Sequence, residues 1–139
     1  MSSKDIIENK ISYILKQIEI ISSYQKYSLD ELSGNVVILG GLKWELYVMN
    51  QAAIDLAEAI VAYKQFRKPT TMREAFDILA EQHMLPPEFV RRFAKMVGFR
   101  NALAHDYEDL KIAVLYDVLM NKLPEVKEFI RYIKDALHI

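Results

Sequence analysis

Five isoleucines near the start of the chain, separated alternately by four and three residues, are Ile7, Ile11, Ile14, Ile18 and Ile21. Apolar residues at this spacing lie on one side of an α-helix, because the helix turns once every 3.6 residues. The pattern predicts a first helix of about four turns with a single apolar stripe. We interpret the stripe as the core-facing side of a bundle helix, with the seam of a dimer as the alternative.

Capping and proline signals predict further helices. Ser28 and Glu31 have the spacing of a capping box, as do Thr71 and Glu74. Two adjacent prolines, Pro86 and Pro87, separate two helical regions, and Pro124 is expected to break or kink the last one. The expected helical regions after the first are a short turn from Ser28, then 35–66, 71–83, 87–107 and 110–137.

No segment alternates apolar and polar residues as a strand would, so the sequence predicts an all-α fold, an antiparallel bundle of five to six helices. With 139 residues, of which 52% are hydrophobic, we expect one domain spanning residues 1–139. Gly40-Gly41 interrupts the second long helical region. We interpret this pair as a close packing contact or a kink, and a ligand approach is the unsupported alternative.

Cysteine is absent, which excludes disulfides and thiolate metal sites. The N-terminus carries charges where a signal peptide needs an apolar run, and the longest apolar stretches are too short to span a bilayer. We therefore expect a soluble, cytoplasmic protein without a membrane partner.

The net charge of −1 gives no global signature of nucleic-acid binding. Basic residues nevertheless gather locally, at Arg91, Arg92 and Lys95. From charge alone, ordinary solvated helix faces are the favoured interpretation, and a local basic patch is the alternative.

The segment from Arg100 to Tyr107 combines side chains that together could carry out proton transfer. Asn101 and His105 are four residues apart and share one helical face, with Arg100 on its flank. Histidine exchanges protons near neutral pH, and arginine holds phosphate through a rigid fork of donors. These groups suit attack of an RNA 2′-hydroxyl on the neighbouring phosphate, a reaction that needs neither metal nor cofactor. On spacing alone, a capping or surface histidine is the commoner interpretation.

Small residues recur every four positions at Ala94, Gly98 and Ala102, which places them on one helical face. The spacing favours tight packing inside the bundle. The alternative is the close approach of a second helix or of a substrate.

The run Arg100-Asn101-Ala102-Leu103-Ala104-His105-Asp106-Tyr107 reads Arg-x4-His-x-Tyr and resembles the signature of the HEPN superfamily, specifically of the HepT toxins. The stretches 69–76, 79–80 and 93–101, together with the long helix containing Leu56 and Ile60, also resemble that family.

This resemblance implies a homodimer in which the motifs of two subunits meet and form a metal-independent endoribonuclease. It implies that His105 transfers the proton, that Arg100 holds the phosphate and that Asn101 orients one of them. Arg91, Arg92 and Lys95 would extend an RNA-binding rim, and the small strip would let the two motif helices approach each other. The implied partner is a small nucleotidyltransferase antitoxin, MntA, with Tyr107 as the acceptor of AMP. AMP on Tyr107 would add negative charge and bulk, and thereby repel RNA.

Two other functions remain open at this point. The domain could be a non-catalytic partner that presents nucleotide or substrate to a nucleotidyltransferase. It could also be a purely structural helical dimer.

Overall fold

The structure, a computed structural model of the chain, describes residues 2–105 and 110–139. Helix α1 spans Ser3–Ser22 and begins at a complete capping box, in which Ser2 and Asp5 each bond the other's backbone N–H. All five isoleucines of the stripe are buried, at most 3% exposed. The first helix is thus confirmed, and its stripe faces the core of this chain, chiefly α3 (Val36–Tyr63).

A 3₁₀ turn, η1 (Ser23–Lys26), leads into α2 (Leu29–Ser33), which begins at the predicted capping box of Ser28 and Glu31. Helix α3 then continues through both glycines without interruption. A Cβ added to Gly41 would lie 2.7 Å from the hydroxyl oxygen of Tyr24, whereas a Cβ on Gly40 would meet nothing within 4 Å. Gly41 therefore serves a close packing contact, and Gly40 does not.

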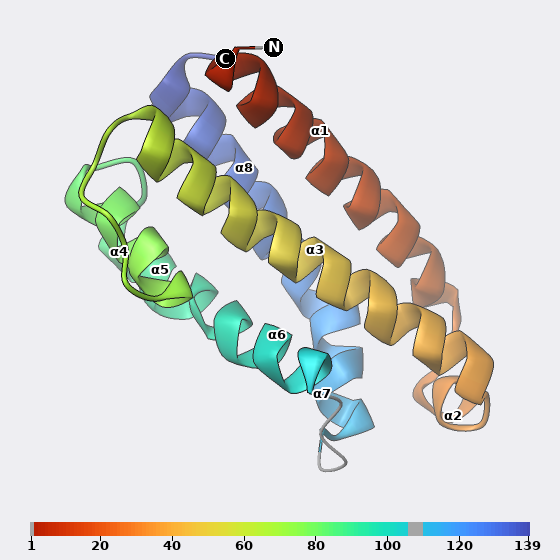
Figure 1. Cartoon of the computed structure of the whole chain (residues 1–139). Coiled ribbons are helices and arrows are strands. Elements are labelled where there is room, and N and C mark those ends of the chain that lie inside the picture. The colour runs from red at the N-terminus through yellow and green to blue at the C-terminus, as the bar shows by residue number, and fades with distance from the viewer. Residues whose placement is uncertain (1, 106–109) are drawn as a thin grey trace.

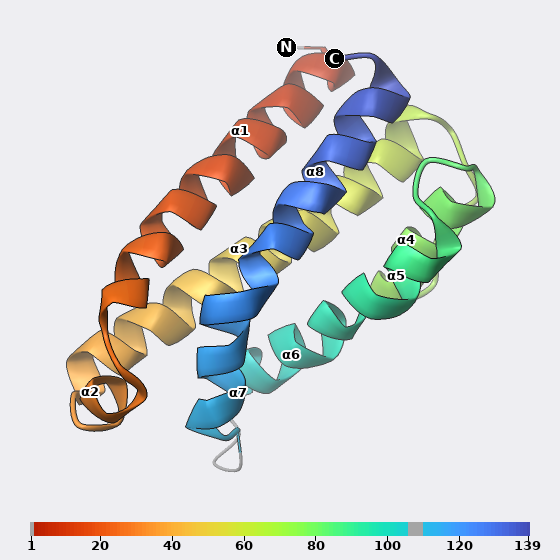
Figure 2. The same ribbon diagram turned by 180° about the vertical axis from the view of Figure 1, so that it is seen from behind.

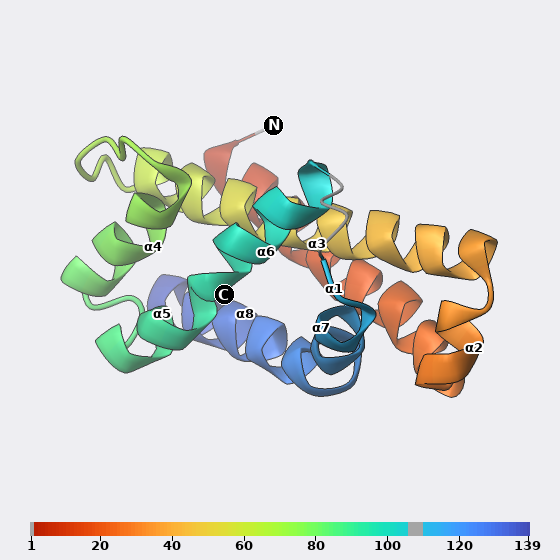
Figure 3. The ribbon, with the colours of Figure 1, turned by 90° about the horizontal axis from the view of Figure 1, so that it is seen from below.

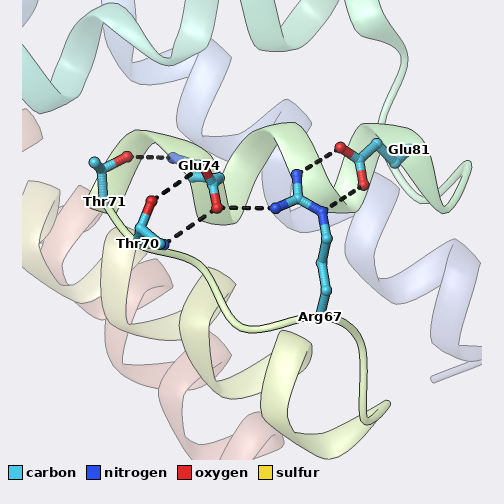
Figure 4. A network of polar contacts seen from close by, with 5 residues as sticks. All are labelled: Arg67, Thr70, Thr71, Glu74 and Glu81. Carbon is cyan, nitrogen blue, oxygen red and sulfur yellow. Dashed lines mark hydrogen bonds and ion pairs between the residues drawn. The ribbon is translucent and has the colours of Figure 1, made fainter.

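Helix α4 (Met72–Glu81) begins at Thr71, whose side chain accepts the N–H of Glu74. The reciprocal half of the predicted capping box is replaced: the Glu74 carboxylate accepts from the backbone N–H of Thr70 and from Arg67. Arg67 also binds both carboxylate oxygens of Glu81 (Figure 4). These contacts fasten the link between α3 and α4 along the side of α4.

The prediction of a single helix from residue 87 to 107 is wrong, because the described part of this range, residues 87–105, forms two helices. Helix α5 (Pro87–Phe93) ends at Ala94, and α6 (Lys95–Ala104) starts from the same residue. Phe89 and Phe93 are buried against Phe129 and Tyr132 of α8, whereas no residue of α6 is fully buried. The break lets α5 follow the aromatic core while α6 lies over α3.

The last helical region also divides, into α7 (Ile112–Asp117), the π-helical turn η2 (Val118–Lys122) and α8 (Leu123–Leu137). Pro124 lies in the first turn of α8, where its missing N–H costs no hydrogen bond. The predicted break at this proline is confirmed, and it takes the form of a π-helical turn before a new helix start.

Figures 1 and 2 show three long helices, α1, α3 and α8, side by side, with α1 antiparallel to the other two. Helices α4, α5 and α6 form a second row, and Figure 3 shows α6 lying alongside α3. No strand occurs among the described residues. The all-helical antiparallel bundle is therefore confirmed. Nowhere in the described ranges is a helix both long enough and apolar enough to cross a membrane.

Candidate active site

Arg100 lies in the middle of α6 and makes three hydrogen bonds, two of them to α3 and one to its neighbour on α6. Its Nε–H donates to Oε1 of Gln51 at 2.6 Å, and Nη2 donates to the hydroxyl of Tyr47 at 3.4 Å. Its Nη1 donates to Oδ1 of Asn101 at 3.0 Å. The guanidinium carbon also lies 5.3 Å from the centre of the Tyr47 ring, a cation–π distance. Arg100 is thus a partly buried cation with a fixed orientation.

A second contact fixes the amide of Gln51. Its Nε2 donates to Oδ1 of Asp55, one turn farther along α3, at 2.9 Å. Because the nitrogen of the amide is taken by Asp55, the carbonyl oxygen faces Arg100. Sequence reasoning missed Tyr47, Gln51 and Asp55. Their spacing of four residues, which places them as a row on one face of the helix, was the available signal.

The structure brings Asn101 and Arg100 together and places His105 one turn beyond them. Asn101 orients the guanidinium, because its side-chain oxygen accepts from Nη1. His105 is the C-cap of α6, and its backbone N–H donates to the carbonyl oxygen of Asn101 at 3.1 Å. His105 is an exposed residue. Tyr107, the predicted acceptor of AMP, lies outside the described residues.

The three predicted rim residues lie at the opposite end of α6 from His105. Arg91 and Arg92 are in the last turn of α5, and Lys95 is the first residue of α6. Lys95 precedes His105 by ten residues, about 15 Å along a helix axis. All three are exposed and line a hollow of about 280 Å³ with Glu88.

Two of these cations have acidic neighbours. A guanidinium nitrogen of Arg92 lies 3.4 Å from Glu125, and one of Arg91 lies 4.0 Å from Glu88. Exposed ion pairs of this kind are weak and screened by salt, so they leave both arginines able to exchange partners.

The sequence favoured tight packing for the strip of small residues, Ala94, Gly98 and Ala102. The structure shows such packing at only one end of the strip. Ala94 is buried at the break between α5 and α6, but Gly98 is exposed, and a Cβ there would meet nothing within 4 Å. The outer side of α6 is therefore open in the single chain.

A larger hollow, of about 620 Å³, lies between α6 and the α7–α8 region, with Arg92, Lys95 and Lys122 among its lining residues. None of Arg100, Asn101 and His105 lines it. We therefore place the candidate chemistry on the α3–α6 surface. Among residues 2–105 and 110–139, no three side chains of the metal-ligating types are grouped to hold an ion.

The chain resembles known proteins along almost its whole length. The chain is 31% identical over 134 residues to the mRNA nuclease HepT of Shewanella oneidensis, covering 94% of this chain and 97% of that protein. It is 26% identical over 132 residues to the tRNA nuclease HepT of Aphanizomenon flos-aquae, covering 95% of this chain and 90% of the relative.

The fold agrees with solved structures. One is a tri-AMPylated HEPN toxin of Shewanella oneidensis in complex with an MNT antitoxin, similar with a TM-score of 0.86 and 28% identity, covering 97% of this chain and 99% of that one. The family described as Ribonuclease HepT-like matches residues 14–133. The match spans most of the chain, including all of α3 and α6 with the side chains just described, and the chain therefore belongs to the HepT-like ribonuclease family.

Proposed function

We propose that this chain is a metal-independent endoribonuclease, the toxin of a HepT/MntA-type toxin–antitoxin pair. The observation that supports this most is the fixed guanidinium of Arg100, held by Gln51 and Asn101 five residues before an exposed histidine. Phosphate transesterification needs a preoriented cation and an acid–base group. The two similar proteins are named as an mRNA nuclease and a tRNA nuclease, which supports cleavage of RNA.

In the proposed reaction His105 accepts the proton of an RNA 2′-hydroxyl. The 2′-oxygen then attacks the adjacent phosphorus, and the bond from phosphorus to the 5′-oxygen of the next nucleotide breaks. The leaving 5′-oxygen takes up a proton from solvent water, and His105 returns the proton it accepted to solvent. The upstream product carries a 2′,3′-cyclic phosphate. Arg100 holds the phosphate and stabilises the added charge as the new bond forms. Asn101 positions Arg100 and is not itself assigned a proton.

The site is proposed to be completed by a second copy of the chain. Helix α6 has no fully buried residue, and Gly98 leaves its outer side open to close approach. A two-fold axis beside α6 would place two copies of the motif in one cleft. Each copy is proposed to be a single domain of residues 1–139, and Arg91, Arg92 and Lys95 are proposed to extend the RNA-binding rim.

Inhibition is proposed to work through Tyr107. A MntA-like nucleotidyltransferase would transfer AMP from ATP to the tyrosine hydroxyl and release pyrophosphate. The similar toxin of Shewanella oneidensis is tri-AMPylated and in complex with an MNT antitoxin, which supports this proposal. We also propose a cytoplasmic location, where the proposed RNA substrate would be available. Intact mass after incubation with the antitoxin and ATP tests the modification, because Tyr107→Phe should remove added AMP.

RNA cleavage by the purified protein in EDTA tests the activity. We expect the wild-type protein to cleave, and Arg100→Ala and His105→Ala to be inactive while keeping the wild-type circular dichroism spectrum. Cleavage that survives both substitutions contradicts the site. An uncleaving wild-type chain that still binds a nucleotidyltransferase tightly would instead identify a non-catalytic partner.

A further inference from the structure

Trp44, the only tryptophan in the chain, is 61% exposed on α3. Tryptophan is usually one of the more buried residues, because its ring carries much apolar surface. Here the indole leaves most of that surface in contact with water. Its ring lies 5.7 Å from the ring of Tyr47, with the two planes tilted by 33°. The exposed indole of Trp44 therefore contacts Tyr47, whose ring in turn contacts Arg100.

Tyr47 contacts both the indole of Trp44 and the guanidinium of Arg100. We call these three residues the Trp44–Tyr47–Arg100 cluster. Hydrogen bonds to described residues occupy three of the five guanidinium N–H groups of Arg100. The cluster therefore combines a fixed phosphate-binding cation at one end with a solvent-facing flat ring at the other.

Helix geometry places Trp44 and His105 at the same level along the α3–α6 pair. Figures 1 and 3 show α6 running antiparallel to α3, and Arg100 contacts α3 at Tyr47 and Gln51. His105 lies five residues beyond Arg100, a rise of about 7.5 Å. Because the two helices are antiparallel, the same distance is covered on α3 by going five residues back. Starting midway between Tyr47 and Gln51, at residue 49, this reaches residue 44. Trp44 and His105 are therefore at the same level along the two helices.

We propose that Trp44 is a stacking platform for one unpaired base of the RNA, on a nucleotide next to the phosphate that Arg100 holds. The proposal rests on the proposed function and extends it to the class of substrate. A base can stack on Trp44 only if it is not already stacked within a duplex, so the site selects single-stranded RNA. Every base has a flat face, so the platform accepts all four with modest preference.

A second copy of this chain is the competing occupant, because exposed apolar side chains also mark protein interfaces. The surroundings of the indole favour RNA. The groups that continue from Trp44 along the surface are a phenol, a guanidinium and the amide of Gln51. Tryptophan, tyrosine and arginine are enriched at protein interfaces as well, so the composition of the cluster does not decide between the two occupants. Its continuity with the guanidinium that is proposed to hold the phosphate favours RNA, because a base next to that phosphate can stack on the adjoining ring.

Because Trp44 is the only tryptophan, its fluorescence reports this site alone. The wild-type protein is titrated with a 2′-O-methyl oligonucleotide, which lacks the attacking hydroxyl and cannot be cleaved. Binding is measured in parallel by fluorescence polarisation of a labelled copy. We expect saturable quenching of Trp44 at the concentration at which polarisation rises. An abasic oligonucleotide of equal length and charge, and a duplex, should leave the emission unchanged.

Variants separate stacking from charge. Trp44→Ala should weaken binding of the 2′-O-methyl oligonucleotide about 5- to 100-fold, the usual effect of removing one stacked ring. It should leave binding of the abasic oligonucleotide unchanged, and Trp44→Phe should retain most of the affinity. Val37→Ala, which truncates another exposed apolar side chain of α3, is the matched control and should have no effect.

Three results would overturn the proposal. The first is polarisation that rises while the emission of Trp44 stays constant. The second is an equal loss of affinity for the 2′-O-methyl and abasic oligonucleotides in Trp44→Ala, and the third is no binding of any oligonucleotide at low salt. A fall in the sedimentation mass of Trp44→Ala would show that a second copy covers the ring. Failure here is distinct from failure of the proposed function, because cleavage that depends on Arg100 and His105 can persist without quenching. Quenching of Trp44 without RNA cleavage would support base stacking on Trp44 and contradict the proposed endoribonuclease activity.

Discussion

The Nε–H of Arg100 on α6 donates a 2.6 Å hydrogen bond to Oε1 of Gln51 on α3, across 49 positions of sequence. The bond joins the motif helix to the longest helix of the described chain. With Asp55 fixing the amide of Gln51, the guanidinium is oriented before any substrate binds. Preorganised donors of this kind stabilise developing charge without reorganising during the reaction.

Gln51→Leu should therefore impair catalysis although Gln51 is assigned no contact with RNA. Losing the acceptor frees Arg100 to move, and misplacement of a phosphate-holding group by about 1 Å costs on the order of 100-fold in rate. We expect kcat/KM for RNA cleavage to fall about 10- to 100-fold. Tyr47→Phe removes only the 3.4 Å hydroxyl contact and keeps the ring under Arg100, so its effect should be below about threefold.

Gln82→Leu, at the exposed C-cap of α4, is the matched control for the loss of an amide. It should cleave RNA at the wild-type rate. If Gln51→Leu also cleaves normally while circular dichroism shows a native fold, Gln51 does not position Arg100.

The motif could be recognised from the sequence, but the residues that hold it could not. Arg100, Asn101 and His105 fall within eight residues of chain, so their spacing alone places them on one helix. Gln51 is brought to Arg100 only by the packing of α6 on α3, so the row of side chains on α3 could be noticed in the sequence but not assigned to Arg100. The sequence does not decide whether Asn101 orients Arg100 or His105. In the structure the side-chain oxygen of Asn101 accepts a hydrogen bond from Arg100.

Replacing each glycine of the Gly40-Gly41 pair by alanine should have opposite effects on stability. Gly40→Ala should raise the free energy of unfolding by about 0.5–1 kcal/mol, because alanine favours the helix and the added methyl meets no atom. Gly41→Ala should be less stable than Gly40→Ala, since its methyl would lie 2.7 Å from the Tyr24 hydroxyl. Urea unfolding measures both.

The double variant Tyr24→Phe/Gly41→Ala identifies the cause. Without the hydroxyl, the nearest remaining atom of the ring lies 3.7 Å from the new methyl, an ordinary contact. The double variant should regain the stability lost by Gly41→Ala relative to Gly40→Ala. A Gly41→Ala protein as stable as Gly40→Ala would show that the contact with Tyr24 is unimportant.

The Arg67 network predicts a pH-dependent contribution to stability. Hydrogen bonding to Arg67 lowers the pKa of Glu81, while the backbone N–H of Thr70, followed by Arg67, lowers the pKa of Glu74. A lowered pKa means that the folded state favours the ionised carboxylates. Their contribution is therefore complete above 4.5, the ordinary pKa of glutamate, and is lost as the pH falls through the lower folded values.

Arg67→Ala should accordingly lower the Tm at neutral pH, with the difference from wild type shrinking as the pH falls below 4.5. Thermal unfolding followed across pH measures it, and added salt should also reduce the difference. Arg131→Ala is the control, because this exposed arginine lies no closer than 4.0 Å to Glu128. A constant Tm difference at all pH values would argue against the network.

The rim residues predict a salt-sensitive component of RNA binding. The double variant Arg91→Ala/Lys95→Ala removes two exposed cations beside the hollow at the start of α6. For single-stranded RNA each lost phosphate contact should reduce the slope of log affinity against log salt by about 0.7. Lys127→Ala/Lys134→Ala, two exposed cations of α8, is the charge-matched control. Unchanged affinity at low salt in the rim variant would refute the rim.

The course of the chain was predictable where signals were local. The isoleucine stripe, the box at Ser28 and the break at Pro124 each depend on neighbouring residues and appear as expected. The break at Ala94 had no such signal, because it lacks a proline or glycine and arises from packing: α5 follows the aromatic core, and α6 follows α3. The same break places Arg92 and His105 on different helices.

The central claim, attack of the 2′-hydroxyl without a metal at the Arg100–His105 site, is tested most directly by the ends of the RNA products. The wild-type protein is incubated with RNA in EDTA, with His105→Ala as background, and the products are analysed by mass spectrometry. We predict 2′,3′-cyclic phosphate on upstream fragments and 5′-hydroxyl on downstream ones, and neither with His105→Ala. Products with 3′-hydroxyl and 5′-phosphate ends, or cyclic phosphate formed equally by His105→Ala, would contradict the account.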